Sequence, residues 1–236
     1  YRVLTPRLCL RCWNPQDAPA LKAAVDASRE HLIPWMPWAR VETTLQMQID
    51  RLRQFRGAFD LGQDFVYGIL SRDESRVLGG SGLHTRADEL ARMIGYWIHV
   101  DHIGRGYASE AAMALTKVAF LVEGIDRVEI RCDPNNTASA SIPRKLGYTH
   151  EATLSRRSHW PDGTARDSMV WSLFASDFPI SPSARLEIQA FDAIGREISI
   201  KDCICHIADF STSRMWLMHH GFQHFSSCYH RFSYLI

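Results

Sequence analysis

The sequence contains no apolar run near the ~20 residues that span a bilayer, and it has no excess of either charge. Across 236 residues, 27 Lys and Arg residues face 26 Asp and Glu residues, which gives a net charge of +1. We therefore expect neither a membrane nor a nucleic acid as a partner. The six cysteines are too few for a disulfide framework, and the first residues show no charged segment followed by an apolar one. These absences predict free thiols and a cytoplasmic location.

Residues 199–236 have an unusual composition, because they contain no proline and a single glycine but five of the 11 histidines and three of the six cysteines. Such side chains are metal ligands. The nearest pair, Cys203 and Cys205, is separated by one residue, however, whereas zinc ligands typically follow a C-x₂₋₄-C spacing. We expect no metal site in the chain.

The hydrophobic pattern predicts a mixed sheet flanked by helices. Alternating apolar residues predict strands at 5–12, 65–69, 77–84, 93–100, 127–132, 149–160 and 166–174. Helical spacing of apolar residues predicts helices at 14–33, from about 43 to 59, at 108–122 and at 137–146. Because proline removes a backbone donor, we expect a kink at Pro143 in the last of these helices.

The most informative stretch runs from Tyr96 to Ala111, where a strand leads through Gly104-Arg105-Gly106 into a helix. Glycines let a backbone approach a ligand closely, and the free N–H groups of a first helical turn bind anions such as a pyrophosphate. Taken alone, the same pattern also fits a simple tight turn. It is neither a P-loop, because no Gly-Lys-Ser/Thr follows, nor a dinucleotide fingerprint.

Further motifs occur in order along the chain: Thr5-Pro6-Arg7-Leu8, Pro34-Trp35-Met36-Pro37-Trp38, Gly104-Arg105-Gly106-Tyr107-Ala108, Asp133 to Ser139, Lys145-Leu146-Gly147-Tyr148 and Asp162-Gly163. Together they resemble the GNAT acetyltransferase superfamily, and within it the RimJ/RimL-type branch of ribosomal-protein N-terminal acetyltransferases. The resemblance implies an α/β fold with a twisted, mostly antiparallel sheet that splays at its central strands and is flanked by helices. It implies a domain over residues 3–180, a trailing segment over 181–198 and an atypical, poorly ordered extension over 199–236.

The resemblance also implies an enzyme, an N-acetyltransferase that moves an acetyl group from acetyl-CoA to a primary amine. The backbone of Ile98, His99 and Val100 is then expected to hydrogen-bond the pantetheine arm, and Asn136 is expected to contact the pantetheine side of the cofactor. The pyrophosphate loop corresponds to Gly104, Arg105, Gly106, Tyr107, Ala108 and Ser109. This loop departs from the family at Ile103, where Gln or Arg is usual, but a backbone cradle does not need that side chain.

The resemblance identifies the catalytic residues less clearly than the cofactor-binding residues. Many GNAT enzymes carry a tyrosine at the position that Pro143 occupies here. In the RimJ/RimL-type branch a serine three residues after the asparagine is a candidate acid for the leaving thiolate, and it maps onto Ser139. A hydroxyl there is equally consistent with a helix cap. Glu129 and Glu30 are candidate bases, although a carboxylate on a strand or helix surface is commonly only solvated. His31 and His99 could relay protons or be structural.

The acceptor side is expected near Trp35, Trp38 and His31, although the two tryptophans could equally anchor their loop. The sequence leaves open whether the amine belongs to a peptide or to a small molecule, and whether the chain is a monomer or a homodimer. A second hypothesis is a GNAT-fold protein that binds acyl-CoA without transferring the acyl group.

Overall fold

The structure is a computed structural model that describes residues 1–85, 90–160 and 162–200, and Tyr1–Ile200 form one compact unit. Its helices are α1 (Ala18–Leu32), α2 (Leu45–Asp60), α3 (Tyr107–Leu121), α4 (Thr137–Lys145) and α5 (Pro182–Arg185). Its strands are β1 (Arg2–Leu4), β2 (Leu8–Cys12), β3 (Phe65–Ser71), β4 (Val77–His84), β5 (Ala91–Ile98), β6 (Arg127–Cys132), β7 (Thr149–His159), β8 (Ala165–Phe174), β9 (Gln189–Phe191) and β10 (Glu197–Ile198). The predicted extension and its Cys/His cluster lie outside the described residues, apart from Ser199 and Ile200.

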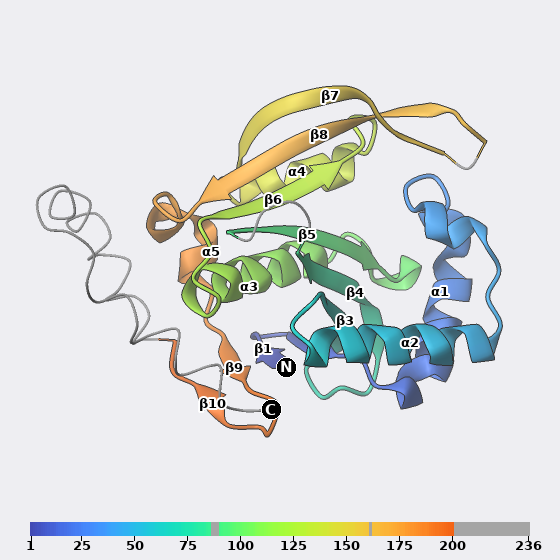
Figure 1. Ribbon diagram of the computed structural model, residues 1–236, viewed down its shortest axis with the longest axis horizontal. Coiled ribbons are helices and arrows are strands. Elements are labelled where there is room, and N and C mark those ends of the chain that lie inside the picture. Colours follow the sequence, from blue (N-terminus) through green and yellow to red (C-terminus); the bar gives the residue numbers. More distant parts are fainter. Residues whose placement is uncertain (86–89, 161, 201–236) are drawn as a thin grey trace, which may run out of the picture. The chain divides into compact units, whose positions relative to one another are not determined.

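The described strands form one sheet in the order β10-β9-β1-β2-β3-β4-β5-β6-β8-β7 (Figure 1). The pair β5–β6 is parallel and is joined through α3, while the other neighbouring pairs are antiparallel. The predicted GNAT-type sheet, mostly antiparallel and flanked by helices, is confirmed. Within the described residues, no helix has the length and apolarity needed to cross a membrane.

The central strands separate toward their carboxyl ends. Strand β5 pairs with β6 from Ala91 opposite Arg127 to Ile94 opposite Ile130. Beyond that point β5 continues to Ile98 and β6 to Cys132, but no pairing joins them. The expected splay is therefore present, and we call the gap in pairing between the carboxyl ends of β5 and β6 the cleft.

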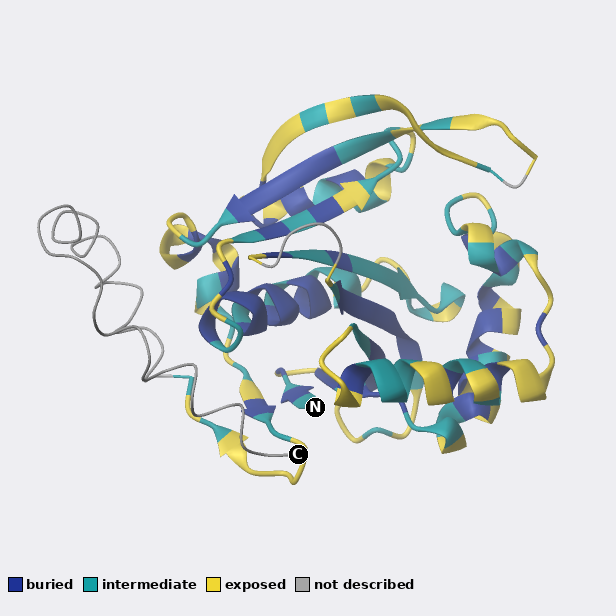
Figure 2. Ribbon diagram, viewed as in Figure 1, coloured by how far each residue is buried: buried dark blue, intermediate teal, exposed yellow. Residues whose placement is uncertain are grey.

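The two faces of the sheet carry different helices. Trp97 of β5 packs against the cluster formed with α1 and α2, which includes the buried Trp13 and Leu52. The preceding residue, Tyr96, reaches Ser139 of α4, so α4 lies on the opposite face, because successive side chains alternate across a strand. Figure 2 shows α3 buried along much of its length, whereas most of β7 is exposed.

Glycine at position 80 of β4 is required by the neighbouring strand. A Cβ there would lie 2.5 Å from Nε1 of Trp97, which is closer than real Cβ contacts allow. The glycine-rich composition of β4 thus lets the Trp97 indole lie against the sheet, and this contact fixes β5 beside β4.

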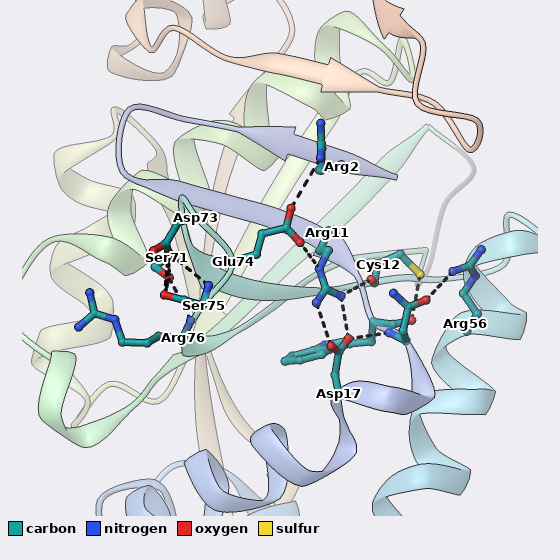
Figure 3. Close-up of polar contacts among 12 residues, drawn as sticks. Arg2, Arg11, Cys12, Asp17, Arg56, Ser71, Asp73, Glu74, Ser75 and Arg76 are labelled. Carbon is teal, nitrogen blue, oxygen red and sulfur yellow. Dashed lines mark hydrogen bonds and ion pairs between the residues drawn. The ribbon is translucent and has the colours of Figure 1, made fainter.

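The predicted first strand at 5–12 is wrong at its start, because two strands, β1 and β2, flank a turn over 5–7. The hydroxyl of Thr5 closes this turn by accepting a hydrogen bond from the N–H of Leu8 at 2.9 Å. The helix predicted from residue 14 begins with a 3-10 turn, Pro15–Asp17, before α1. Its Asp17 carboxylate accepts the N–H of Asn14 at 2.8 Å and a bidentate pair from Arg11 (Figure 3).

Residues 181–198 extend the sheet at its edge. Strand β9 pairs with β1, placing Ala190 opposite Val3, and β10 pairs with β9. Helix α3 holds the same segment, because Nζ of Lys117 donates to the carbonyls of Ala184 and Leu186 at 3.0 and 2.9 Å. This trailing segment is therefore packed onto the domain on two sides.

Candidate active site

The edge of β5 in the cleft exposes backbone groups. Antiparallel partners alternate between hydrogen-bonded and non-bonded pairs, and His99 donates its N–H to the carbonyl of Leu78 at 2.8 Å. The pairs Ile98–Gly79 and Tyr96–Ser81 are then the non-bonded ones. The backbone N–H and C=O groups of Ile98 and Tyr96 consequently point toward β6, on the side where β6 has separated.

This register bears on the three residues whose backbone was predicted to bind the pantetheine arm, Ile98, His99 and Val100. The N–H of His99 is bound by Leu78, and the N–H of Val100 donates to the buried hydroxyl of Ser28 at 3.0 Å. The structure therefore leaves Ile98 as the available donor of the three. Tyr96, which the sequence did not single out, joins it.

The loop after β5 ends at the amino terminus of α3. Gly104 and Gly106 have φ values of +72° and +79°, a left-handed conformation that glycine adopts without strain. Gly106 is the N-cap of α3, and its carbonyl accepts the first helical bond from the N–H of Glu110 at 3.0 Å. The N–H groups of Tyr107, Ala108 and Ser109 thus precede the first helical hydrogen bond and have no acceptor within the helix, an arrangement that suits an anion.

A buried carboxylate fixes this loop to the amino-terminal part of the domain. Glu110 accepts the Thr5 hydroxyl at 2.5 Å, the Arg7 N–H at 3.0 Å and Nε of Arg7 at 2.6 Å. Nη1 of Arg7 also donates to the carbonyl of Arg105 at 2.9 Å, and the guanidinium lies 4.9 Å from the Tyr107 ring. The Thr5-Pro6-Arg7-Leu8 motif therefore holds the loop between β5 and α3 in place.

Ser139 lies on α4 at the far side of the cleft. Its N–H donates to Oδ1 of Asn136 at 3.0 Å, so the helix cap is Asn136, and the alternative that the Ser139 hydroxyl caps this helix is wrong. The hydroxyl of Tyr96 instead lies 3.2 Å from Oγ of Ser139. The structure thus brings together the predicted acid and a second hydroxyl from β5.

Pro143 explains why Tyr96 can reach this helix. A residue four positions after Ser139 would normally donate its N–H to the Ser139 carbonyl, but proline has no N–H. The Tyr96 hydroxyl lies 3.3 Å from that carbonyl oxygen and donates to it. Burial raises the pKa of Tyr96 well above its usual value, against the opposing effect of the hydrogen bond with Ser139, so this hydroxyl is protonated at physiological pH.

Glu129 is not a solvated strand residue. Its side chain is 13% exposed, and its two carboxylate oxygens accept hydrogen bonds from Nε of Arg127 at 3.0 Å and from Nε and Nη2 of Arg131 at 3.0 and 2.8 Å. These neighbours at i−2 and i+2 share its face of β6. With both oxygens engaged, Glu129 is poorly arranged to take a proton from an amine. Glu30 is exposed on α1.

The predicted aromatic loop lies between α1 and α2. Trp38 packs against the core cluster and meets Trp97 edge to face, with ring centroids 6.1 Å apart, which is an anchoring contact. The half-buried Trp35 accepts a hydrogen bond at its carbonyl from Arg166 of β8 at 3.4 Å. His31 is exposed near the end of α1.

The β7–β8 hairpin contributes residues that the sequence did not single out. Arg166 stacks on Trp160 at 3.8 Å and donates to Asp133 at 3.2 Å, and Arg40 stacks on the same indole at 4.1 Å. The tip of the hairpin is thereby joined to the loop that holds Trp35. The sequence feature that could have indicated these contacts was Trp160, at the tip of the predicted hairpin.

These features fit acetyl-CoA. The backbone edge of Tyr96 and Ile98 suits an amide-containing arm, the α3 turn suits a pyrophosphate, and a Cβ on Gly104 would meet no atom within 4 Å, so the loop surface there is open. In the part of the chain that the structure describes, no group of three or more His, Cys, Asp or Glu residues is placed to hold a metal ion.

The acetyltransferase (GNAT) domain family matches residues 7–149 of this chain. An uncharacterized N-acetyltransferase of Bacillus subtilis, YoaA, is 28% identical over 170 residues, which cover 72% of this chain and 94% of YoaA. Among solved structures, Mycobacterium smegmatis RimJ in complex with CoA-disulfide has a TM-score of 0.69 at 23% identity, covering 78% of this chain and 91% of RimJ. RimL, a ribosomal L7/L12 alpha-N-protein acetyltransferase in complex with coenzyme A, has a TM-score of 0.66 at 21% identity, covering 72% of this chain and 95% of RimL.

The family match covers more than half of the chain, and the similar folds include RimJ and RimL. The predicted resemblance is confirmed, and with it the acyltransferase class and acetyl-CoA as the cosubstrate of this fold. The chain belongs to the GNAT acetyltransferase family.

Proposed function

We propose that the protein transfers the acetyl group of acetyl-CoA directly to a primary amine within a ternary complex. The observation that carries this proposal is the cleft between β5 and β6, which ends at the amino terminus of α3. One side of the cleft offers the backbone of Tyr96 and Ile98, and the other side offers Asn136 and Ser139. Acetyl-CoA supplies the thioester; the chain supplies its binding groups and proton donors.

The binding roles follow from the geometry. The N–H groups of Tyr107, Ala108 and Ser109 bind the pyrophosphate, and the positive-φ glycines hold them in place. Arg105 adds charge at the same turn. The N–H of Ile98 hydrogen-bonds the pantetheine arm, and that of Tyr96 lies where an oxyanion that develops in the cleft would be stabilised.

The proton roles centre on Ser139. Its hydroxyl donates a proton to the leaving thiolate and is reprotonated through solvent by the proton that the attacking amine releases, and Tyr96 positions that hydroxyl from 3.2 Å. Because Tyr96 also binds the Ser139 carbonyl, it holds the first turn of α4 toward β5. A separate base is not required, since an exposed amine is partly neutral near its ordinary pKa. Of the two candidate carboxylates, Glu30 stays the candidate base, because among the described residues arginines engage the oxygens of Glu129 and not those of Glu30.

The acceptor that the surroundings favour is the amino terminus of a peptide. The loop and hairpin near Trp35 and Trp160 are aromatic, and the nearby carboxylates of Asp133, after β6, and Asp162 pair with Arg166 and Arg40. A polycationic amine would therefore find both of these carboxylates already paired with an arginine. RimL, which has a similar fold, acts on a protein amino terminus according to its name.

An acceptor screen read by release of free CoA tests this proposal. We expect turnover with peptides that carry a free α-amine and none with the same peptides after amino-terminal acetylation. CoA binding without thiol release for any acceptor would instead favour an acyl-CoA-binding protein without transferase activity. Absence of CoA binding would refute the assignment of the cleft.

A further inference from the structure

A second polar hollow lies beside the amino terminus of α3, on the flank away from the β5–β6 cleft. It has a volume of about 300 Å³, and its lining includes Arg7, Arg72, Arg76, Arg105, Asp73 and His102. Arg72, Asp73 and Arg76 come from the β3–β4 turn, and Arg7 comes from the β1–β2 turn. None of the cleft residues Tyr96, Asn136 and Ser139 lines this hollow, which we call the arginine pocket.

The arginine pocket carries a surplus of positive charge. Four guanidinium groups line the pocket together with the Asp73 carboxylate, and Glu110 pairs with Arg7 beneath them, so this set of side chains has a surplus of two positive charges. Hydrogen bonds from Ser71 and Ser75 lower the pKa of Asp73 to about 2. Its Oδ1 is turned into its own loop, where it accepts from both hydroxyls and from the Ser75 N–H.

The walls of the pocket are held in place before any ligand binds. Glu74, at a left-handed φ of +60°, pairs with Arg11 at 2.7 Å and with Arg2 at 3.6 Å, which fixes the β3–β4 turn (Figure 3). Arg72 donates to the carbonyl of Thr5, while Thr5 itself donates to Glu110. These contacts connect the β1–β2 and β3–β4 turns to each other and to β1 and β2.

Donors remain available on these arginines. A guanidinium has five N–H donors; Arg7 directs Nε and Nη1 to Glu110 and to the Arg105 carbonyl, and Arg105 directs Nη2 to the Asp101 carbonyl. Figure 3 shows the Arg76 side chain extending away from the Asp73 turn. Nδ1 of His102 is buried without a hydrogen-bond partner among the described residues.

We propose that the arginine pocket binds a phosphate monoester dianion. Two surplus positive charges match a dianion, and guanidinium forks match tetrahedral phosphate oxygens. The pocket adjoins Arg105 and Tyr107 of the pyrophosphate loop. The phosphate therefore belongs either to the adenosine 3′-phosphate of a bound CoA, in which case the inference rests on the proposed function, or to a separate phosphate ligand.

Titration calorimetry of the full chain at low salt distinguishes these sources. The titrants are CoA, dephospho-CoA and inorganic phosphate, the last also added to protein saturated with dephospho-CoA. The variants are Arg76→Gln and, as a matched control, Arg53→Gln on the outer face of α2, whose side chain is 69% exposed. Thermal unfolding of each variant confirms that the fold is retained.

If the CoA 3′-phosphate is the ligand, wild type binds CoA more tightly than dephospho-CoA, and Arg76→Gln weakens CoA about tenfold with no change for dephospho-CoA. If the ligand is separate, CoA and dephospho-CoA bind equally, and phosphate binds the saturated wild type but not Arg76→Gln. The proposal is overturned if wild type neither distinguishes the two cofactors nor binds phosphate, or if Arg76→Gln matches Arg53→Gln. Failure of dephospho-CoA to bind would refute the proposed cosubstrate site. Binding of inorganic phosphate to wild type, lost in Arg76→Gln, would in that case still support the arginine pocket.

Discussion

Replacement of Gly106 by alanine separates the loop's role in folding from its role in ligand binding. At a φ of +79°, a side chain costs about 1–2 kcal/mol of conformational strain. The new Cβ would lie 3.4 Å from Nη2 of Arg7, which is a flexible side-chain end, so direct crowding adds little. For a domain of this size the loss corresponds to a fall in Tm of about 2–8 °C.

Ligand binding should suffer more than stability. The strain is relieved when the loop shifts, and a shift moves the α3 N–H groups away from the pyrophosphate. Loss of one charge-assisted hydrogen bond, about 1.5–3 kcal/mol, weakens the Kd for CoA about 10- to 150-fold.

Gly195→Ala is the matched control for this experiment. Gly195 has a φ of +82°, and a Cβ added there would meet no atom within 4 Å; the residue lies in the β9–β10 turn, away from the loop. We expect a similar fall in Tm and an unchanged Kd, measured by thermal unfolding and calorimetry. If Gly106→Ala loses stability like Gly195→Ala and keeps the wild-type Kd for CoA, the assignment of the loop is wrong.

Three further changes test the site and its support. Ser139→Ala should lower kcat about 100-fold at an unchanged CoA Kd, and a wild-type kcat in steady-state assays would remove the acid role. Tyr96→Phe should lower kcat about tenfold in wild type but have no effect in the Ser139→Ala background, because it acts through Ser139; additive losses would contradict a positioning role. Glu110→Ala should lower the free energy of unfolding in urea by about 2 kcal/mol, because it leaves the half-exposed Arg7 and the buried Thr5 without their partner. The control is Glu42→Ala, at an 84% exposed carboxylate, which should change the free energy of unfolding by less than about 1 kcal/mol. Equal effects of these two changes would show that the buried carboxylate does not support the loop.

Local patterns predicted the elements that are long enough to show a period. Strand β6 begins and ends at the predicted residues, and α3 is found within one residue of its predicted limits. Strands β1, β9 and β10 were missed, because two or three residues cannot display an alternation and because their pairing joins the two ends of the domain. The hydrophobic pattern of the sequence therefore could not predict the strands at this edge of the sheet.

The candidate site likewise has parts that the sequence could predict and parts that it could not. The loop at Gly104 and Gly106 could be predicted, because positive φ and a helix start are local properties. The contact between Tyr96 and Ser139 spans 43 positions and depends on how β5 and α4 meet, so no periodicity reveals it. The ion pairs of Glu129, by contrast, could be predicted from the alternation of charge over Arg127, Glu129 and Arg131. That alternation argues against Glu129 as a base, because it places two arginines beside the carboxylate.

The way residues 181–198 pack has a consequence for the design of shortened proteins. A protein cut at residue 180 would keep every residue of the cleft, yet it would expose the backbone edge of β1, and exposed edges pair with other chains. The Lys117 ammonium, whose pKa burial lowers, would lose both carbonyls that bind it. Such a truncation should aggregate even though the proposed catalytic residues are intact, so a shortened protein should keep at least β9, which covers the β1 edge.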